Sequence, residues 1–383
     1  MYLEDYKNLE NRLPKEGEQP VYYEGMKITR HLFQSPRAEL LPDLPSDPLE
    51  ALPDKDIFEN QCFPFFVFHP ADKTRHDGAI ILLHGLNEKS WNKYLPWAAE
   101  LSRNTGKKIL LFPLSFHMDR APAGWSSPRT MLILSKLRKE RFGAGESSFI
   151  NAALSSRLHA APQRFFSSGL EAFADVTALL RMIRRGGVDG VGTEGRIDFF
   201  GYSIGAFLTQ ILMLANPEGL LSDSRAVLFC GGATLDRMNP VSKYILDSAA
   251  AAALRTHLAR KGDPLNEQPF GDVRIGESYE PAARVFQSMA QDAPGREDRE
   301  KLLQKVTGRL FAILLKQDRV MPAEAVKKTL VCRNNPLKKF LRVLDFPFPH
   351  DHVTPFPQLT VGQDKVDRAF KHVFTLAAEG LGG

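Results

Sequence analysis

Apolar residues along the chain gather in short unbroken runs, and segments with helical spacing separate these runs. The runs have the length and composition of strands buried on both faces of a sheet. They lie at 79–83 (AIILL), 108–113 (KILLFP), 196–200 (RIDFF), 226–230 (AVLFC), 310–315 (LFAILL) and 341–346 (LRVLDF). Apolar residues three and four apart predict helices over 91–102, 170–185, 207–214, 323–330 and 365–378. A further strand is possible within 21–33.

Strands that alternate with helices indicate an α/β fold with a mostly parallel, doubly wound sheet and helices on both faces. The alternation stops twice, for about fifty residues after 116 and for about seventy after 233. Both interruptions follow the carboxyl end of a strand, the edge where ligands bind in open α/β sheets. We therefore expect an N-terminal arm and connector (1–60), a core (61–118, 166–235 and 306–383) and two lid insertions (119–165 and 236–305).

Composition and charge narrow the function classes. The chain has 383 residues, 43% of them hydrophobic and 25% charged, which is ordinary for a globular protein. The net charge of +5 is too small to argue for nucleic acid, and we interpret the densest basic run, 136–141, as a solvated helix face. No apolar run approaches the ~20 residues of a membrane span, and the N-terminus does not resemble a secretory signal.

Three widely separated cysteines, Cys62, Cys230 and Cys332, have neither metal-ligand spacing nor a disulfide framework. A reducing compartment suits them best, so we expect a soluble protein of the cytoplasm. Oligomeric state does not follow from the sequence.

The sharpest chemical signal is the run GYSIG at 201–205, between the strand at 196–200 and the helix at 207–214. A G-x-S-x-G turn between a strand and a helix holds its serine at strained backbone angles, where side chains at the flanking glycines would clash. The turn lifts the serine oxygen above the sheet edge, and the following helix points its N-terminus at the same place. Ser203 is therefore a candidate nucleophile.

With this motif the chain resembles the α/β-hydrolase superfamily, specifically its serine esterases and lipases, over about 65–118, 166–235 and 306–380. The second mark of the resemblance is a strand that ends in His84-Gly85-Leu86-Asn87. The resemblance implies that the backbone amides of Leu86 and Ile204 form an oxyanion hole, and that His84 supports the loop.

The resemblance also implies an acid and a base that follow the serine in the chain. Asp318, in the D-x-V-x-P run at 318–322, is the expected acid, although a turn residue or helix cap is an alternative reading. Asp236 is the fallback. The base is His350 or His352, and we favour His352 because it stands closer to Pro355-Phe356.

Together these residues predict a serine hydrolase with a Ser-His-Asp triad that cleaves a carboxylic ester or related small acyl compound without metal or organic cofactor. The alternatives are an acyltransferase, thioesterase, amidase or C–C hydrolase on the same fold, and a non-catalytic ligand-binding protein. Tyr202 and two residues of the first insertion, His117 and Arg120, are candidate substrate-binding residues, with structural hydrogen bonding as the alternative.

Overall fold

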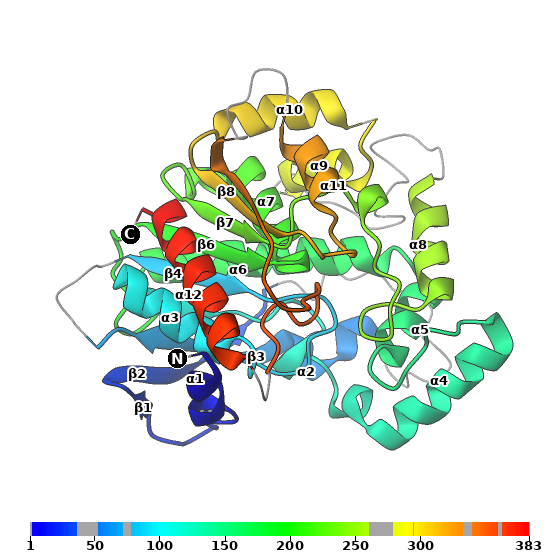
Figure 1. Ribbon diagram of the computed structural model, residues 1–383, viewed down its shortest axis with the longest axis horizontal. Coiled ribbons are helices and arrows are strands. Elements are labelled where there is room, and N and C mark those ends of the chain that lie inside the picture. Colours follow the sequence, from blue (N-terminus) through cyan, green and yellow to red (C-terminus); the bar gives the residue numbers. More distant parts are fainter. Residues whose placement is uncertain are drawn as a thin grey trace.

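A nine-stranded sheet forms the centre of the molecule in this computed structural model, which describes residues 2–36, 53–71, 78–259, 279–293, 295–331, 339–358 and 362–382 (Figure 1). Its strands are β1 (Val21–Tyr23), β2 (Met26–Gln34), β3 (Cys62–His69), β4 (Ala79–Leu83), β5 (Lys108–Leu111), β6 (Ile197–Tyr202), β7 (Ala226–Phe229), β8 (Leu310–Leu315) and β9 (Leu341–Leu344). They lie in the order β1-β2-β3-β5-β4-β6-β7-β8-β9.

The first three strands are antiparallel to their neighbours, and the six from β5 to β9 are parallel. The fold is thus the expected α/β class, a mostly parallel doubly wound sheet of the α/β-hydrolase type. Two strands that were predicted, β4 and β8, have the predicted bounds.

Helices cover both faces of the sheet. One face packs against α1 (Tyr2–Leu9), α3 (Leu95–Thr105) and α12 (Gln363–Gly380). The other packs against α6 (Arg164–Arg184), α7 (Ile204–Ala215), α9 (Glu280–Ala290), α10 (Arg296–Lys305) and α11 (Ala323–Leu330). Successive residues of β4 face opposite cores: Ile81 and Leu83 pack on the second, Ile80 and Leu82 on the first. Both faces are therefore apolar, and so the buried strands read as unbroken apolar runs.

The strand β3 was not predicted, although it joins the antiparallel edge to the parallel core. Its sequence contains Pro64, which cannot donate a ladder hydrogen bond and argues against a central strand. In the structure β3 pairs with β5 only over Phe66–Phe68, so Pro64 lies outside that stretch and faces Leu32 of β2.

The described part of the N-terminal arm, residues 2–36 and 53–60, packs on the core. The strand β2 pairs with β3 along its length, and α1 lies against α3 and α12. A short helix, α2 (Phe58–Gln61), leads into β3.

Between β5 and β6 and again after β7, the chain leaves the alternation to form α4 (Pro128–Phe142), α5 (Ala152–Ala160) and α8 (Ser248–Ala259). The helix α5 packs against both α4 and α8, and the three lie together beside the sheet (Figure 1). The basic run of α4 is exposed at Lys136 and Arg141, but Arg138 is buried and binds Asp247 with both carboxylate oxygens at 2.6 and 2.8 Å. The interpretation of this run as a wholly solvated face is therefore wrong at Arg138.

Among the described residues, no helix combines the length and apolar character needed to cross a membrane.

Candidate active site

Ser203 stands at the tight turn between β6 and α7, with φ 57° and ψ −117°. A left-handed φ is costly for a non-glycine residue and marks a turn that its surroundings enforce. The flanking glycines are required by space, because a Cβ on Gly201 would lie 2.5 Å from Thr209 Oγ1. A Cβ on Gly205 would lie 2.3 Å from the carbonyl oxygen of Leu83. The two glycines thus allow the tight turn that holds Ser203 at these strained angles.

A continuous chain of hydrogen bonds starts at this hydroxyl. Ser203 Oγ lies 2.7 Å from His352 Nε2, and His352 Nδ1 lies 2.7 Å from Asp318 Oδ2. All three side chains are buried. Asp318 accepts further hydrogen bonds at Oδ1 from the amides of Val320 and Met321, which fix the carboxylate. Because the ionised carboxylate only accepts, the Nδ1–H tautomer of His352 satisfies both contacts and leaves Nε2 free to take the Ser203 proton.

The two histidines of the loop after β9 have different surroundings. His350 Nδ1 lies 2.9 Å from the carbonyl of Phe348, and its ring packs against Phe346 with centroids 4.8 Å apart. Its Nε2 is buried with no partner among the described residues. The structure thus brings His352, and not His350, to Ser203. Asp236 accepts a hydrogen bond from the amide of Asp292 and does not take part in this chain.

Tyr202 holds the loop that carries His352. Its phenol donates a hydrogen bond to the backbone carbonyl of His352, and the two rings stack with centroids 5.6 Å apart. Burial raises the pKa of Tyr202 well above its ordinary value, so the phenol keeps its proton for this hydrogen bond.

Cys230, which sequence reasoning did not assign to the site, lies beside Asp318. Burial and the charge of Asp318 raise the pKa of its thiol well above the ordinary value, so it is a neutral neighbour of the carboxylate. It directly follows β7, which pairs with the nucleophile strand β6, and this place after a strand was the only sequence signal for its position.

Hydrogen bonds to neighbouring segments fix the loop that follows β4. His84 Nε2 accepts the amide of Leu114 at 2.9 Å, and His84 Nδ1 lies 2.8 Å from the carbonyl of Gly85. Burial lowers the pKa of His84 well below its ordinary value, so the ring is neutral and structural. The hydroxyl of Tyr94 accepts the amide of Gly85. No described residue accepts a hydrogen bond from the amides of Leu86 or Ile204.

Arg120 has no side open to a substrate. Its guanidinium is fully buried, 2.7 Å from Asp175 and 3.8 Å from Glu171, and it also bonds Asn60 and the carbonyl of Pro113. The structure therefore gives it a structural place in the core, instead of the substrate contact expected from sequence.

His117 lines a cavity together with Leu86, Phe165 and Ile204, and Ser203 is not among its lining residues. Burial lowers the pKa of His117 to about 4, so its ring is neutral near pH 7. Its Nδ1 faces the carbonyl of Ser115 at 2.8 Å. Of the three residues expected to bind substrate, Tyr202 alone lines a cavity together with Ser203.

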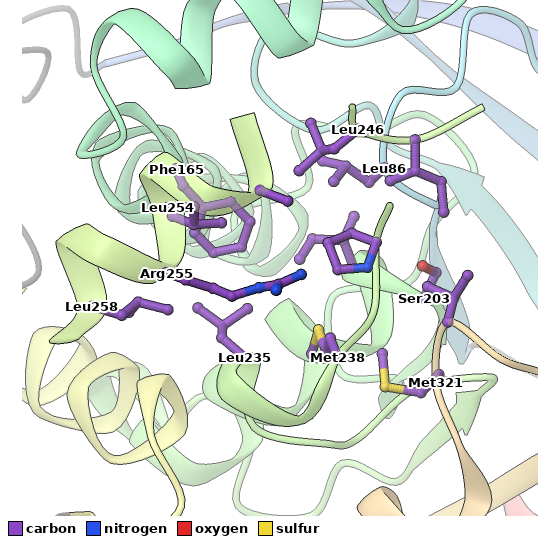
Figure 2. A pocket seen from close by; sticks show the side chains of 15 residues that line it. Leu86, Phe165, Ser203, Leu235, Met238, Leu246, Leu254, Arg255, Leu258 and Met321 are labelled. Atoms are coloured by element: carbon purple, nitrogen blue, oxygen red, sulfur yellow. The ribbon is translucent and has the colours of Figure 1, made fainter. Parts of the chain in front are cut away.

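Two cavities meet at Ser203. The first has an empty volume of about 610 Å³ and is almost wholly apolar; Figure 2 shows it between α8 and the nucleophile turn. Much of its wall comes from the second interruption of the alternation: Leu235, Met238, Pro240, Ile245, Leu246, Ala251, Leu254, Arg255 and Leu258. The second, of about 700 Å³, is more polar and is lined by His352 and by the loop from Gly85 to Ser90.

Two cations beside these cavities were not predicted. Lys89 lines the polar cavity, where burial lowers its pKa to about 8, and Arg255 lines the apolar cavity. Lys89 follows the His-Gly loop directly, so its place was readable from the motif, whereas Arg255 lies in the helical second interruption with no motif around it. Among the described residues, no cluster of three or more His, Cys, Asp or Glu side chains is arranged to hold a metal.

Comparison with known proteins gives a family without an assigned activity. A family model described as a family of unknown function (DUF6051) matches residues 30–382. No curated protein matches the chain.

Solved structures are similar to this chain only at low identity and low TM-score. They include carboxyl esterase 2 from the mycorrhizal fungus Tuber melanosporum (13% identity, TM-score 0.45, covering 97% of this chain and 92% of that one). A bacterial heroin esterase has 12% identity and a TM-score of 0.46, covering 94% and 86%. A peroxisomal α/β-hydrolase from Saccharomyces cerevisiae has 14% identity and a TM-score of 0.44, covering 93% and 91%. At these values the likeness carries no argument about activity.

Proposed function

The chain belongs to the DUF6051 family, and we propose that it is a serine hydrolase that cleaves a carboxylic ester or related acyl compound through an acyl-enzyme on Ser203. The observation that carries the proposal is the continuous hydrogen-bond chain from Ser203 Oγ through His352 to Asp318, with both links at 2.7 Å. Nucleophile, base and orienting carboxylate within hydrogen-bond reach are what covalent acyl transfer needs.

In the proposed reaction Ser203 Oγ attacks the substrate carbonyl while His352 Nε2 takes its proton. Asp318 accepts from Nδ1–H, keeps the ring in this tautomer and stabilises the imidazolium that forms. His352 then returns the proton to the leaving oxygen, which departs as the alcohol. Water repeats the sequence on the acyl-enzyme and releases the acid.

The negative charge of the tetrahedral intermediate needs donors that are already in place. The amides of Leu86 and Ile204 are proposed for this role because no described residue takes their hydrogen bonds. Each such donor is worth about 3 kcal/mol of transition-state stabilisation. Ile204 also begins α7, whose N-terminus favours negative charge at the same place.

We also propose that the residues between 119 and 165 and between 236 and 305 act as a lid. Phe165 and residues from Leu235 to Leu258 form much of the apolar cavity wall, which supports a role in excluding water and selecting the substrate. A cytoplasmic location, expected from the scattered cysteines, belongs to the same proposal.

The test is covalent labelling of Ser203 with a fluorophosphonate probe, followed by hydrolysis of p-nitrophenyl esters of graded chain length. We expect labelling and turnover in the full chain and neither in Ser203→Ala. A folded chain that is not labelled and hydrolyses no ester would favour a ligand-binding protein. Labelling with turnover only when an acceptor alcohol is added would favour an acyltransferase.

A further inference from the structure

The apolar cavity beside Ser203 contains one charge. Fifteen described residues line it, and Ser203 and Arg255 are the two that are not apolar. Figure 2 shows the Arg255 side chain reaching from α8 into the cavity, between Leu254, Leu258, Leu235 and Met238, with its guanidinium end turned toward the side where Ser203 lies. Arg255 is nevertheless exposed to solvent, so its side chain lies along the cavity wall without losing contact with water.

Arg255 occupies a cavity-facing position of its helix. Ala251, Leu254 and Leu258 line the same cavity, and Arg255 completes the i, i+3, i+4, i+7 spacing that defines one helix face. Arg255 is the charged and solvent-exposed member of this otherwise apolar face.

Other arginines near the cavity have acidic partners. Arg138 binds Asp247, and Arg157 and Arg164 both bind Asp54. Arg255 makes no ion pair or hydrogen bond with any of the described residues. A guanidinium presents a planar fork of donors that matches a carboxylate, and such pairs gain strength next to apolar walls. The N–H donors of the Arg255 guanidinium are therefore available to a ligand.

The place of His352 identifies which part of the substrate enters this cavity. His352 must give its proton to the leaving oxygen, so the leaving group belongs on the side of the ring. His352 lines the polar cavity and not the apolar one. The acyl chain therefore belongs in the apolar cavity, where its far end meets Arg255.

We infer that the substrate is an ester whose acyl chain carries a carboxylate remote from the scissile bond, and that Arg255 binds this carboxylate. The apolar walls take the methylene chain between the two ends. This inference rests on the proposed function and narrows it from esters in general to monoesters of dicarboxylic acids.

The test compares matched substrates. Mono-p-nitrophenyl esters of butanedioic, hexanedioic, octanedioic and decanedioic acids are compared with p-nitrophenyl esters of the monocarboxylic acids of equal length. At the best length we expect kcat/KM to favour the charged acyl chain by about tenfold, the factor that a charge-assisted hydrogen bond supplies. In Arg255→Gln this ratio should fall to about one, and Arg255→Lys should keep part of it because the charge remains without the fork.

Arg284→Gln is the matched control, because it removes one positive charge from the exposed face of α9, where Arg284 pairs with Glu280, and leaves the cavity intact. It should keep the full preference. Calorimetry on Ser203→Ala supplies a readout without catalysis, with octanedioate expected to bind more tightly than octanoate and Arg255→Gln in that background to abolish the difference.

Equal turnover of charged and neutral chains, or a preference that survives Arg255→Gln, would overturn the inference and leave the hydrolase proposal standing. That result would mean that Arg255 lays its aliphatic stem on the apolar wall and keeps its charge in water. If no ester is hydrolysed, the hydrolase proposal fails instead. Equal binding of octanedioate and octanoate by Ser203→Ala would then also overturn the role of Arg255.

Discussion

The phenol of Tyr202 donates a hydrogen bond to the backbone carbonyl of His352, and its ring stacks on the imidazole at an interplanar angle of 19°. Tyr202 immediately precedes Ser203, so the turn that presents the nucleophile also holds the base. The two residues are 150 positions apart in the chain. The nucleophile strand therefore helps to hold the base in place, together with the hydrogen bond from His352 to Asp318.

Removing the phenolic hydroxyl of Tyr202 should therefore lower the catalytic rate without changing the shape of the substrate site. In Tyr202→Phe the ring stacking survives, but a buried carbonyl loses its donor and His352 gains freedom. We expect kcat to fall about tenfold, with KM nearly unchanged, because a lost buried hydrogen bond costs about 1–3 kcal/mol. Steady-state kinetics on a p-nitrophenyl ester measure the split, with Tyr22→Phe on the exposed surface as control. A rise in KM with constant kcat would show that Tyr202 binds substrate instead.

The two neighbouring histidines should respond very differently to substitution. His352→Gln removes the group next to Ser203 and should lower kcat at least ~10³-fold, because nucleophile and base act as a unit. His350→Gln should keep most activity, since its ring contacts Phe346 and the carbonyl of Phe348. Rates for both variants, with circular dichroism to verify folding, decide between them. Loss of activity in His350→Gln alone would reverse the assignment.

The backbone of Ser203 should store measurable strain. Its φ of 57° is unfavourable for any residue with a Cβ and easy for glycine. We expect Ser203→Gly to be more stable than Ser203→Ala by about 1 kcal/mol, which is the strain relief less the entropy cost of glycine. Urea unfolding of the two inactive variants gives this difference directly. An alanine variant that is as stable as the glycine variant would mean that the turn relaxes.

Glu171 should make stability depend on pH. Burial is the main reason that its pKa is raised to about 7 from an ordinary 4.5, against the opposing charge of Arg120. A carboxyl with a raised pKa binds more protons in the folded than in the unfolded state between these values. Its contribution to stability is therefore complete below 4.5 and is lost as the pH rises through the raised pKa.

Glu171→Gln should remove this dependence while its amide oxygen still accepts from Asn60. As the pH rises from about 5 to about 8, across the titration range of Glu171, the free energy of unfolding of the variant should increase relative to that of the unsubstituted chain. Urea unfolding of both proteins at each pH checks the sign. A variant that follows the same pH dependence would show that Glu171 does not titrate in this range.

The ion pair between Arg138 and Asp247 should hold the two proposed lid segments together. Arg138 lies on α4, and Asp247 precedes α8 and caps it by accepting the amide of Ala250 at 3.0 Å. Burial opposes the charge of Asp247, but the hydrogen bond from Arg138 and the Ala250 amide lower its pKa below the ordinary 3.8. Its contribution is therefore present above that value and lost as the pH falls through the lowered pKa.

Arg138→Met should leave a buried carboxylate without its partner and lower the free energy of unfolding by about 3–5 kcal/mol. Arg141→Met, on the exposed part of the same helix, should change it by less than about 0.5 kcal/mol. Thermal and urea unfolding compare the two. Equal stability of both variants would show that the segments do not depend on this pair.

The sequence by itself determined the parallel sheet and the turn at Ser203. Strands buried on both faces leave unbroken apolar runs, and a turn this tight tolerates only glycine around its serine, so both are local signals. The strand β3 was not predicted from the sequence. Its Pro64 is acceptable only where the neighbouring strand β5 has no residue to pair with, and this depends on the arrangement of the sheet.

The tertiary structure alone decided where the polar side chains point. His350 and His352 differ by two positions in one loop, and the contact with Tyr202 from a distant strand orients the second toward Ser203. From the sequence, Arg120 and Arg138 were interpreted as a substrate residue and a surface residue. In the structure both are buried, and each pairs with a carboxylate: Arg120 with one from α6, Arg138 with one from the segment before α8. A charged side chain reveals its role only through its partner, and such partners come together by long-range packing that no local pattern records.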